Sequence, residues 1–222
     1  MMVARLMGTM VLASLLAAPT PAPPWKGLPL RTMTKDHGGK NGDVTNLAFE
    51  GSQATIIAAF KKIGWVQADP LSAVNDAHLA AAAVAHQPYP TAPVSTLYLF
   101  GRMQDFAMEH EVGTVSKRDH ARFWDTKRQD PQTHLELWLS DASRDIAIEP
   151  TMKDNVPVGT THKIAPNIDA ERGLIGAALH HAGLVAAEVI EMGIPTTNGR
   201  NGSGDRFFTD GKVPVFVLQT PR

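Results

Sequence analysis

His120-Ala121-Arg122-Phe123-Trp124 alternates polar and apolar residues, and this run decides the fold class. Successive side chains of a β-strand point to opposite faces, so His120, Arg122 and Trp124 would share one face. Ala121 and Phe123 would share the other face and supply the core. The run therefore predicts a strand with one apolar face and one face that carries charge.

Outward from this run, strand-like and helix-like segments follow one another without a regular βα alternation. Helices are predicted where a capping residue precedes apolar positions at helical spacing and a glycine closes the pattern. Two early helices and a late one, with several strands between them, predict an α+β fold. We expect a single domain with a mostly antiparallel sheet packed by about three helices. The expected strands are 44–50, 94–100, 104–110, 120–124, 135–139, 145–149, 160–164, 184–190 and 213–218, and the expected helices are 52–64, 71–86 and 169–182.

The first 22 residues have the pattern of a secretory signal peptide. A basic start, Met1 to Arg5, leads into the apolar block Leu6 to Ala18, and prolines then prevent a continuing helix. The apolar block is shorter than the roughly 20 residues that span a bilayer. We therefore expect a periplasmic or secreted protein, with an uncleaved N-terminal membrane anchor as the alternative. The Pro-, Gly- and Lys-rich residues 23–43 predict a flexible linker, and residues 44–222 the folded domain.

The composition excludes several classes of function. The 222 residues include no cysteine, which excludes disulfides, thiol chemistry and cysteine-bound metal. The formal net charge is −1, so no basic surface for nucleic acid is predicted. The nine histidines are the main reason to look for a site.

Several segments, taken together in their order along the chain, are distinctive. They are NLAFEGS (46–52), YPTAPVSTLYLFGRMQDFAMEH (89–110), HARFW (120–124), THKI (161–164), DAER (169–172) and GDRFFTDG (204–211). This ordered set resembles the LssY C-terminal domain family from residue 44 onward.

The resemblance implies a cellular context rather than a reaction. The family takes its name from a protein associated with a type I secretion locus, and related chains often carry the domain behind membrane segments. No established activity or cofactor follows from it. The expected function is an exported accessory or binding domain of the cell envelope, and the expected partner is an envelope or secretion-system protein.

A set of polar residues among strand-like apolar ones forms a candidate site. Histidine titrates near neutral pH, so it can act as a general acid or base, and guanidinium groups bind oxyanions. A carboxylate would orient the histidine. This pattern suggests, as the alternative function, a hydrolase acting on a phosphate- or ester-bearing envelope molecule. The candidate catalytic residues are His120 and His162, and the candidate substrate-binding residues are Arg102, Asp105, Arg122, Glu171 and Arg172.

The same residues also suggest an internal network of ion pairs, such as Arg102–Asp105 and Arg122–Glu171. The two readings predict different structures. A hydrolase requires the histidines and arginines to converge in an open pocket, whereas an accessory domain would bury and pair them or hold them apart. The histidine spacing does not demand a metal, and no metal site is predicted.

Overall fold

The computed structural model describes residues 24–28, 30, 32–85, 87–114, 117–153, 156–192 and 198–220. The predicted signal peptide, residues 1–22, lies outside these ranges. Inside them, no helix combines the length and the apolar character needed to cross a bilayer. In chain order the elements are β1 (Met33–Lys35), β2 (Asn41–Glu50), α1 (Gln53–Lys62), β3 (Val66–Gln67), α2 (Ala73–Ala85), β4 (Tyr98–Leu99), β5 (Arg102–Met103), β6 (Phe106–Thr114), β7 (Lys117–Gln129), β8 (Glu136–Lys153), β9 (Val156–Ile164), α3 (Ile168–His181), β10 (Val185–Met192), β11 (Asn198–Arg200), β12 (Arg206–Phe208) and β13 (Lys212–Leu218).

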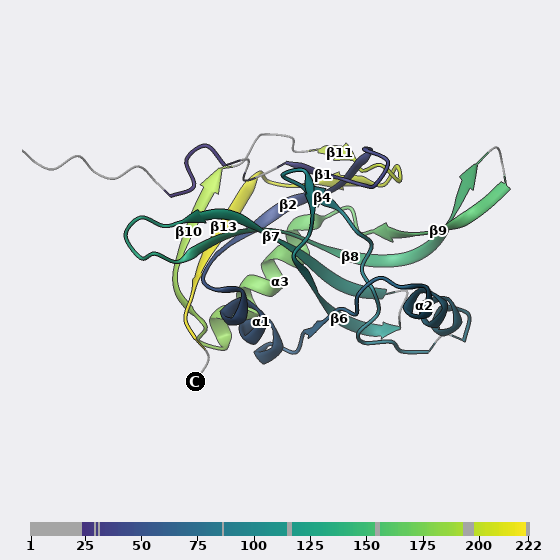
Figure 1. Cartoon of the computed structure of the whole chain (residues 1–222), viewed down its shortest axis with the longest axis horizontal. Helices are drawn as coiled ribbons and strands as arrows, with labels where there is room; N and C mark the ends of the chain where they lie inside the picture. Colours follow the sequence, from purple (N-terminus) through teal and green to yellow (C-terminus); the bar gives the residue numbers. More distant parts are fainter. Residues whose placement is uncertain are drawn as a thin grey trace, which may run out of the picture.

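A curled sheet of 11 strands dominates the molecule (Figure 1). Its main path runs β3-β6-β7-β8-β2-β1-β4-β5. One branch adds β9 to β8, and a second adds β13 to β2 and then β10 to β13. Among the strand pairs of the described chain, β13 and β2 run parallel and the others run antiparallel. The predicted α+β class with a mostly antiparallel sheet and three helices is confirmed.

Helix α1 begins and ends where the sequence indicates. The Oγ of Ser52 accepts a hydrogen bond from the Thr55 N–H at 3.1 Å, which satisfies one of the free donors at the helix start. Gly64 follows the helix with φ of +91°, a conformation that favours glycine. Ile56 and Phe60 are buried, so α1 packs its apolar face on the sheet.

Helices α3 and α2 differ in how they meet the sheet. Asn167 caps α3, whose Ile175 and Leu179 are buried in the same core as α1. Helix α2 lies at the periphery (Figure 1), and Val74 and Val84 on it are 76% and 84% exposed. Of the three expected packing helices, α1 and α3 therefore cover the sheet, and α2 leaves apolar residues exposed.

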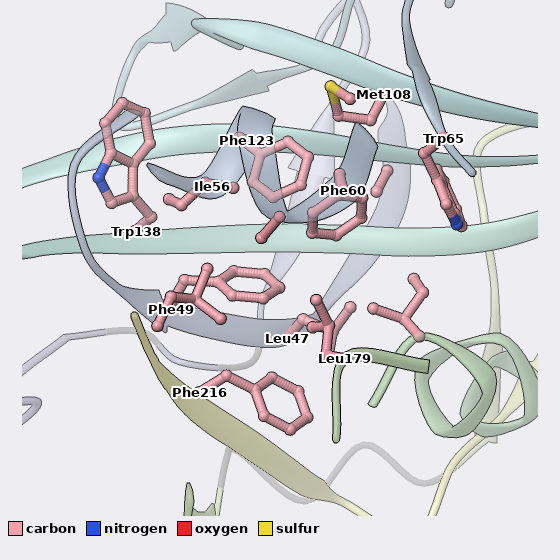
Figure 2. Packing of buried hydrophobic residues seen from close by; sticks show 14 of the residues in the cluster. Leu47, Phe49, Ile56, Phe60, Trp65, Met108, Phe123, Trp138, Leu179 and Phe216 are labelled. Atoms are coloured by element: carbon pink, nitrogen blue, oxygen red, sulfur yellow. The ribbon is translucent and has the colours of Figure 1, made fainter. Parts of the chain in front are cut away.

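The main core is aromatic (Figure 2). The ring of Phe49 on β2 lies with its centroid 5.7 Å from that of Phe60 on α1, 5.6 Å from Phe123 on β7 and 5.8 Å from Phe216 on β13. Phe123 also stacks on Phe106, with centroids 4.5 Å apart. The Phe49 ring thus links its own strand β2 to α1, β7 and β13. The predicted core role of Phe123 is confirmed.

The other face of the sheet is also buried. Trp124 of β7 packs there with Leu137 and Leu139 of β8 and with Val215 of β13. His120 and Arg122 lie on this face too, beyond the apolar cluster. Strand β7 is therefore buried on both sides, and its charged residues face the interior.

The expected flexible linker, residues 23–43, is corrected by its contacts. Trp25 is buried, and its indole N–H donates to the Glu50 carboxylate at 3.0 Å. Strand β1 pairs antiparallel with β2, which itself begins at Asn41. Thr34 is fully buried. The polar and Gly-rich composition of this range conceals an inner strand of the sheet, β1, which lies between β2 and β4. Its strand residues are few and its one tryptophan is isolated, so the sequence gives little sign of it.

Candidate functional site

Strands β7 and β8 bring the polar side chains of the candidate site together. The register places His120 opposite Ser143 and Arg122 opposite Asp141. Residues directly opposite in an antiparallel pair share a face, so these four side chains point to the same side of the sheet. The cluster is built from paired strands and not from loops.

His120 lies between two carboxylates. Its Nε2 contacts the Ser143 hydroxyl at 3.0 Å and lies 3.7 Å from Oδ2 of Asp43. Its Nδ1 lies 3.5 Å from Oδ2 of Asp145 and has no hydrogen-bond partner. The imidazole is 3% exposed, so a substrate in solution has no direct access to it.

Arg122 is enclosed by groups that satisfy its donors. Its Nη1 lies 3.1 Å from the Asp43 carboxylate and 3.3 Å from the Asp141 carboxylate. Its Nε donates to the Ser95 carbonyl, and its Nη2 to the Ser95 hydroxyl, each at 2.9 Å. The guanidinium therefore has no free edge with which to bind an oxyanion.

Arg118 completes the network on the side of β6. Its Nη1 is 2.7 Å from Oε1 of Glu109, a close contact without hydrogen-bond alignment. Its Nε donates to Asp145 at 3.2 Å, and its Nη2 donates to the Pro93 carbonyl. The segment that contains Pro93 and Ser95 thus closes the cluster from outside. We call Asp43, Glu109, Arg118, His120, Arg122, Asp141, Ser143 and Asp145 the buried ionic network.

The electrostatics of the network favour a protonated His120. Burial alone would lower the pKa of His120, but the Asp145 and Asp43 carboxylates outweigh burial and raise it to about 9. Burial favours the neutral form of Asp145, yet the charged His120 beside it lowers the pKa of that carboxyl. These two groups therefore form an ion pair at neutral pH.

The remaining acids balance the charge. Burial raises the pKa of Glu109 to about 8 in spite of Arg118, and burial raises the pKa of Asp141 to about 6 in spite of Arg122. With Glu109 protonated at neutral pH, the cations Arg118, His120 and Arg122 face the anions Asp43, Asp141 and Asp145. The network is then neutral overall, which is the condition under which charges can be buried without a counter-ion.

His162 on β9 reaches the edge of this network. Its Nδ1 lies 4.0 Å from Oδ2 of Asp145, and its side chain is 22% exposed. Burial lowers the pKa of His162 to about 4, although Asp145 acts in the opposite direction. The structure thus brings both candidate catalytic histidines close to the Asp145 carboxylate. At neutral pH His120 is charged and His162 is neutral.

The pair Arg102 and Asp105 lies apart from His120 and His162. Nη1 of Arg102 donates to both Asp105 oxygens, at 2.8 and 2.7 Å, and Nη2 donates to the Asp125 carbonyl. Asp105 also accepts from the Asp125 N–H at 2.8 Å. The expected Arg102–Asp105 ion pair is confirmed, and it ties the turn after β5 to β7.

Glu171 is buried on the other face of the sheet from His120. Its Oε2 lies 3.2 Å from Arg144, which also binds Asp119. Burial raises the pKa of Glu171 to about 8, and the nearby Asp119 carboxylate adds to the effect. The expected pairing of Arg122 with Glu171 is wrong, because the sheet lies between them and Arg144 takes that place.

Arg172 points away from the buried network. Its guanidinium donates to Asp210 at 3.0 and 3.1 Å and to the Lys212 carbonyl at 2.6 Å. It lines a surface groove of about 310 Å³ between α3, β10 and β13. The floor of this groove is apolar, and Phe216, Pro214 and Ile190 contribute to it. A wider hollow of about 500 Å³ lies on α2.

Of the eight residues of the buried ionic network, only His120 and Arg122 are among the site residues predicted from the sequence. Asp43 falls in the predicted linker, and Glu109 and Arg118 are not among the predicted site residues. Asp141, Ser143 and Asp145 follow each other at every second position, which is the signal that could have placed them on one strand face. Within the described ranges, no group of three His, Asp or Glu side chains is arranged to hold a metal ion.

Comparison with known proteins identifies the family. The profile of the family described as LssY C-terminus matches residues 25–213. The chain belongs to the LssY C-terminus family. No curated protein and no solved structure matches it. All residues of the buried ionic network lie within the part of this LssY C-terminus domain that the family profile covers, and so does Trp25 at its start.

Proposed function

We propose that this LssY C-terminus domain is an exported, non-enzymatic binding or accessory module of the cell envelope. The observation that carries the proposal is the enclosure of the buried ionic network. His120 and Arg122 are 3% and 2% exposed, and protein groups satisfy the guanidinium on every side. A general base must reach the proton that it removes, so this arrangement supports a structural role.

The location of the surface hollows supports the same conclusion. The groove lined by α3, β10 and β13 has an apolar floor and is remote from His120, which lies on the opposite face of the sheet. Apolar hollows with a few polar groups are the usual places for binding. An envelope or secretion-system protein is the partner that we propose, and the N-terminal leader supports a periplasmic or secreted location.

Cell fractionation tests the location. The chain with a C-terminal tag is compared with a variant that lacks residues 2–22. We expect the full chain in the periplasmic fraction or the medium, and the shortened chain in the cytosol. Recovery of the intact, unprocessed full chain in the cytosol would overturn the envelope role, and its recovery in washed membranes would support the uncleaved anchor instead.

A hydrolase assay tests the absence of catalysis. The purified chain, His120→Gln and the exposed-residue control His181→Gln are incubated with p-nitrophenyl phosphate and p-nitrophenyl butyrate. We expect the same background rate for the three proteins. Circular dichroism shows whether His120→Gln is folded. If the natural chain and His181→Gln turn over substrate and the folded His120→Gln protein does not, the hydrolase alternative is established.

A further inference from the structure

The outer edge of strand β10 is open. Within the described chain, β10 pairs with β13 on one side, and no strand pairs with its other side. Strands β3 and β5, which end the main path of the sheet, have two residues each, whereas β10 has eight. A long unpaired edge presents a row of backbone donors and acceptors to another strand.

The side chains of β10 do not protect this edge. Natural sheets block such edges with charged side chains, above all lysine, with proline or with β-bulges. The register irregularity of β10 lies at its start, between Val185 and Ala187, and residues 187–192 pair regularly with β13. The sequence VAAEVIEM contains neither lysine nor proline. Val189 and Ile190, on opposite faces of the strand, are each 50% exposed. Glu188 is held by His180 of α3 at 2.5 Å and is drawn toward the helix.

We propose that β10 pairs antiparallel with β10 of a second copy of this chain, in the register that places Val189 opposite Val189. In this register Glu188 lies opposite Ile190, and Glu191 lies opposite Ala187. No glutamate then faces a glutamate, whereas a parallel pairing in register would oppose both acids to their own copies. The charge pattern of the strand thus fits a copy of itself.

The surroundings of the strand support this pairing. On one face, Val189 lies beside Val215, whose side chain belongs to the second core, so two copies would extend that apolar layer across the interface. On the other face, Ile190 lies beside Pro214 at the groove. The formal net charge of −1 gives two copies little reason to repel each other.

The two-fold axis of such a pair is perpendicular to the joined sheet. Both copies of α3 would therefore lie on the same face of the continuous sheet, one on each side of the paired β10 strands. The groove of each copy would open toward that of the other. The pairing would turn two separate hollows into one longer channel whose floor is β-sheet.

Charge substitutions test the register by sedimentation velocity of the purified chain. Val189→Lys would oppose two lysines, and we expect at least a tenfold weaker dimer. In Ala187→Lys, the introduced lysine of each copy would lie opposite Glu191 of the other copy. We therefore expect a dimer at least as tight as that of the natural chain at low salt. Val112→Lys is the matched control, because Val112 is a strand valine with 42% exposure on β6; we expect no change.

A disulfide trap gives an independent test. Since the chain has no cysteine, Val189→Cys introduces a single thiol, and Val112→Cys is its control. Opposite residues of an antiparallel pair have Cα atoms about 4.5–5.5 Å apart, within the range that a disulfide accepts. We expect mild oxidation to link the Val189→Cys chains alone. A monomeric natural chain, a Val189→Lys dimer of unchanged affinity, or equal cross-linking of both cysteine variants would overturn the proposal.

Discussion

Oδ2 of Asp145 lies 3.5 Å from Nδ1 of His120 and 4.0 Å from Nδ1 of His162. One buried carboxylate on β8 therefore lies close to two histidines, one on each of the strands β7 and β9 that flank β8. It also accepts from Arg118 at 3.2 Å. Asp145 is 1% exposed, so the charges of His120 and Arg118 stabilise its carboxylate, and water does not.

Removing the charge of Asp145 is expected to destabilise the fold strongly. Asp145→Asn leaves a protonated His120 and Arg118 buried without their shared anion. Breaking a buried ion pair from one side costs about 3–5 kcal/mol. Urea unfolding followed by tryptophan fluorescence measures the loss. Glu136→Gln, at a half-buried carboxylate outside the network, is the control and should change stability by less than about 0.5 kcal/mol.

Stability is expected to fall as the pH rises from 6.5 to 9. The pKa of His120 is raised to about 9 and that of Glu109 to about 8. In this pH range the folded protein therefore keeps protons bound that the unfolded chain releases. Each group stabilises the fold fully below its ordinary pKa and loses that contribution as the pH rises through the folded value. His162, with a pKa lowered to about 4, acts below this window. Urea midpoints at pH 6.5, 7.5 and 9 measure the decline.

The Glu109→Gln variant tests the source of this decline. Glutamine resembles the protonated acid and cannot ionise, so the variant should fold and lose less stability between pH 6.5 and 9 than the natural chain. Glu136→Gln should keep the natural slope. A slope that Glu109→Gln leaves unchanged would show that Glu109 ionises in the folded protein as it does in water.

Phe49 is expected to be among the most sensitive apolar positions. It is fully buried and its ring meets Phe60, Phe123 and Phe216 (Figure 2). Phe49→Ala should cost about 3–5 kcal/mol, because the cavity is bounded by rings from several elements and cannot collapse easily. Phe208→Ala is the control, since Phe208 is 45% exposed and should cost far less. Differential scanning calorimetry compares the two; equal losses would contradict the assigned core.

Two glycines of α3 are expected to respond in opposite ways to alanine. A Cβ at Gly173 would meet no atom within 4 Å, so Gly173→Ala should stabilise the helix by about 1 kcal/mol. A Cβ at Gly176 would come within 2.9 Å of the Phe216 ring. Gly176→Ala should therefore gain less or lose stability, because Phe216 must move from its buried position. Thermal unfolding of the pair measures the difference, and an equal gain would mean that Phe216 moves without cost.

The sequence patterns located the elements whose two faces differ in polarity. HARFW has an apolar face formed by Ala121 and Phe123, and both residues are fully buried in the aromatic core. The boundaries of α1 also follow from local signals, Ser52 at the start and Gly64 at the end. Such signals depend on neighbours in the chain, so they can be read without knowing the tertiary partners.

Strand β8 illustrates what the sequence conceals. The residues of the two strands predicted at 135–139 and 145–149 belong largely to one strand of 18 residues. The intervening Ser140, Asp141 and Ser143 look like part of a polar loop, yet all three are buried. Their backbone pairs with β2 and β7, and the side-chain partners of Asp141 and Ser143 lie on β7. Hydropathy along one segment cannot reveal such distant partners. The same reason hid Asp43 and led to the wrong partner for Arg122.

The position of β2 in the sheet has a consequence for the order in which the chain acquires structure. Phe49 pairs with Trp138 on one side and with Phe216 on the other. Strand β2 therefore needs β8 and β13, both far along the sequence, to complete its pairing. Contacts between such distant residues require the closure of large loops, and chains dominated by them fold slowly. Strand β2 is therefore synthesised long before β13, one of the two strands that flank it, and it cannot complete its pairing until residues 212–218 have been made.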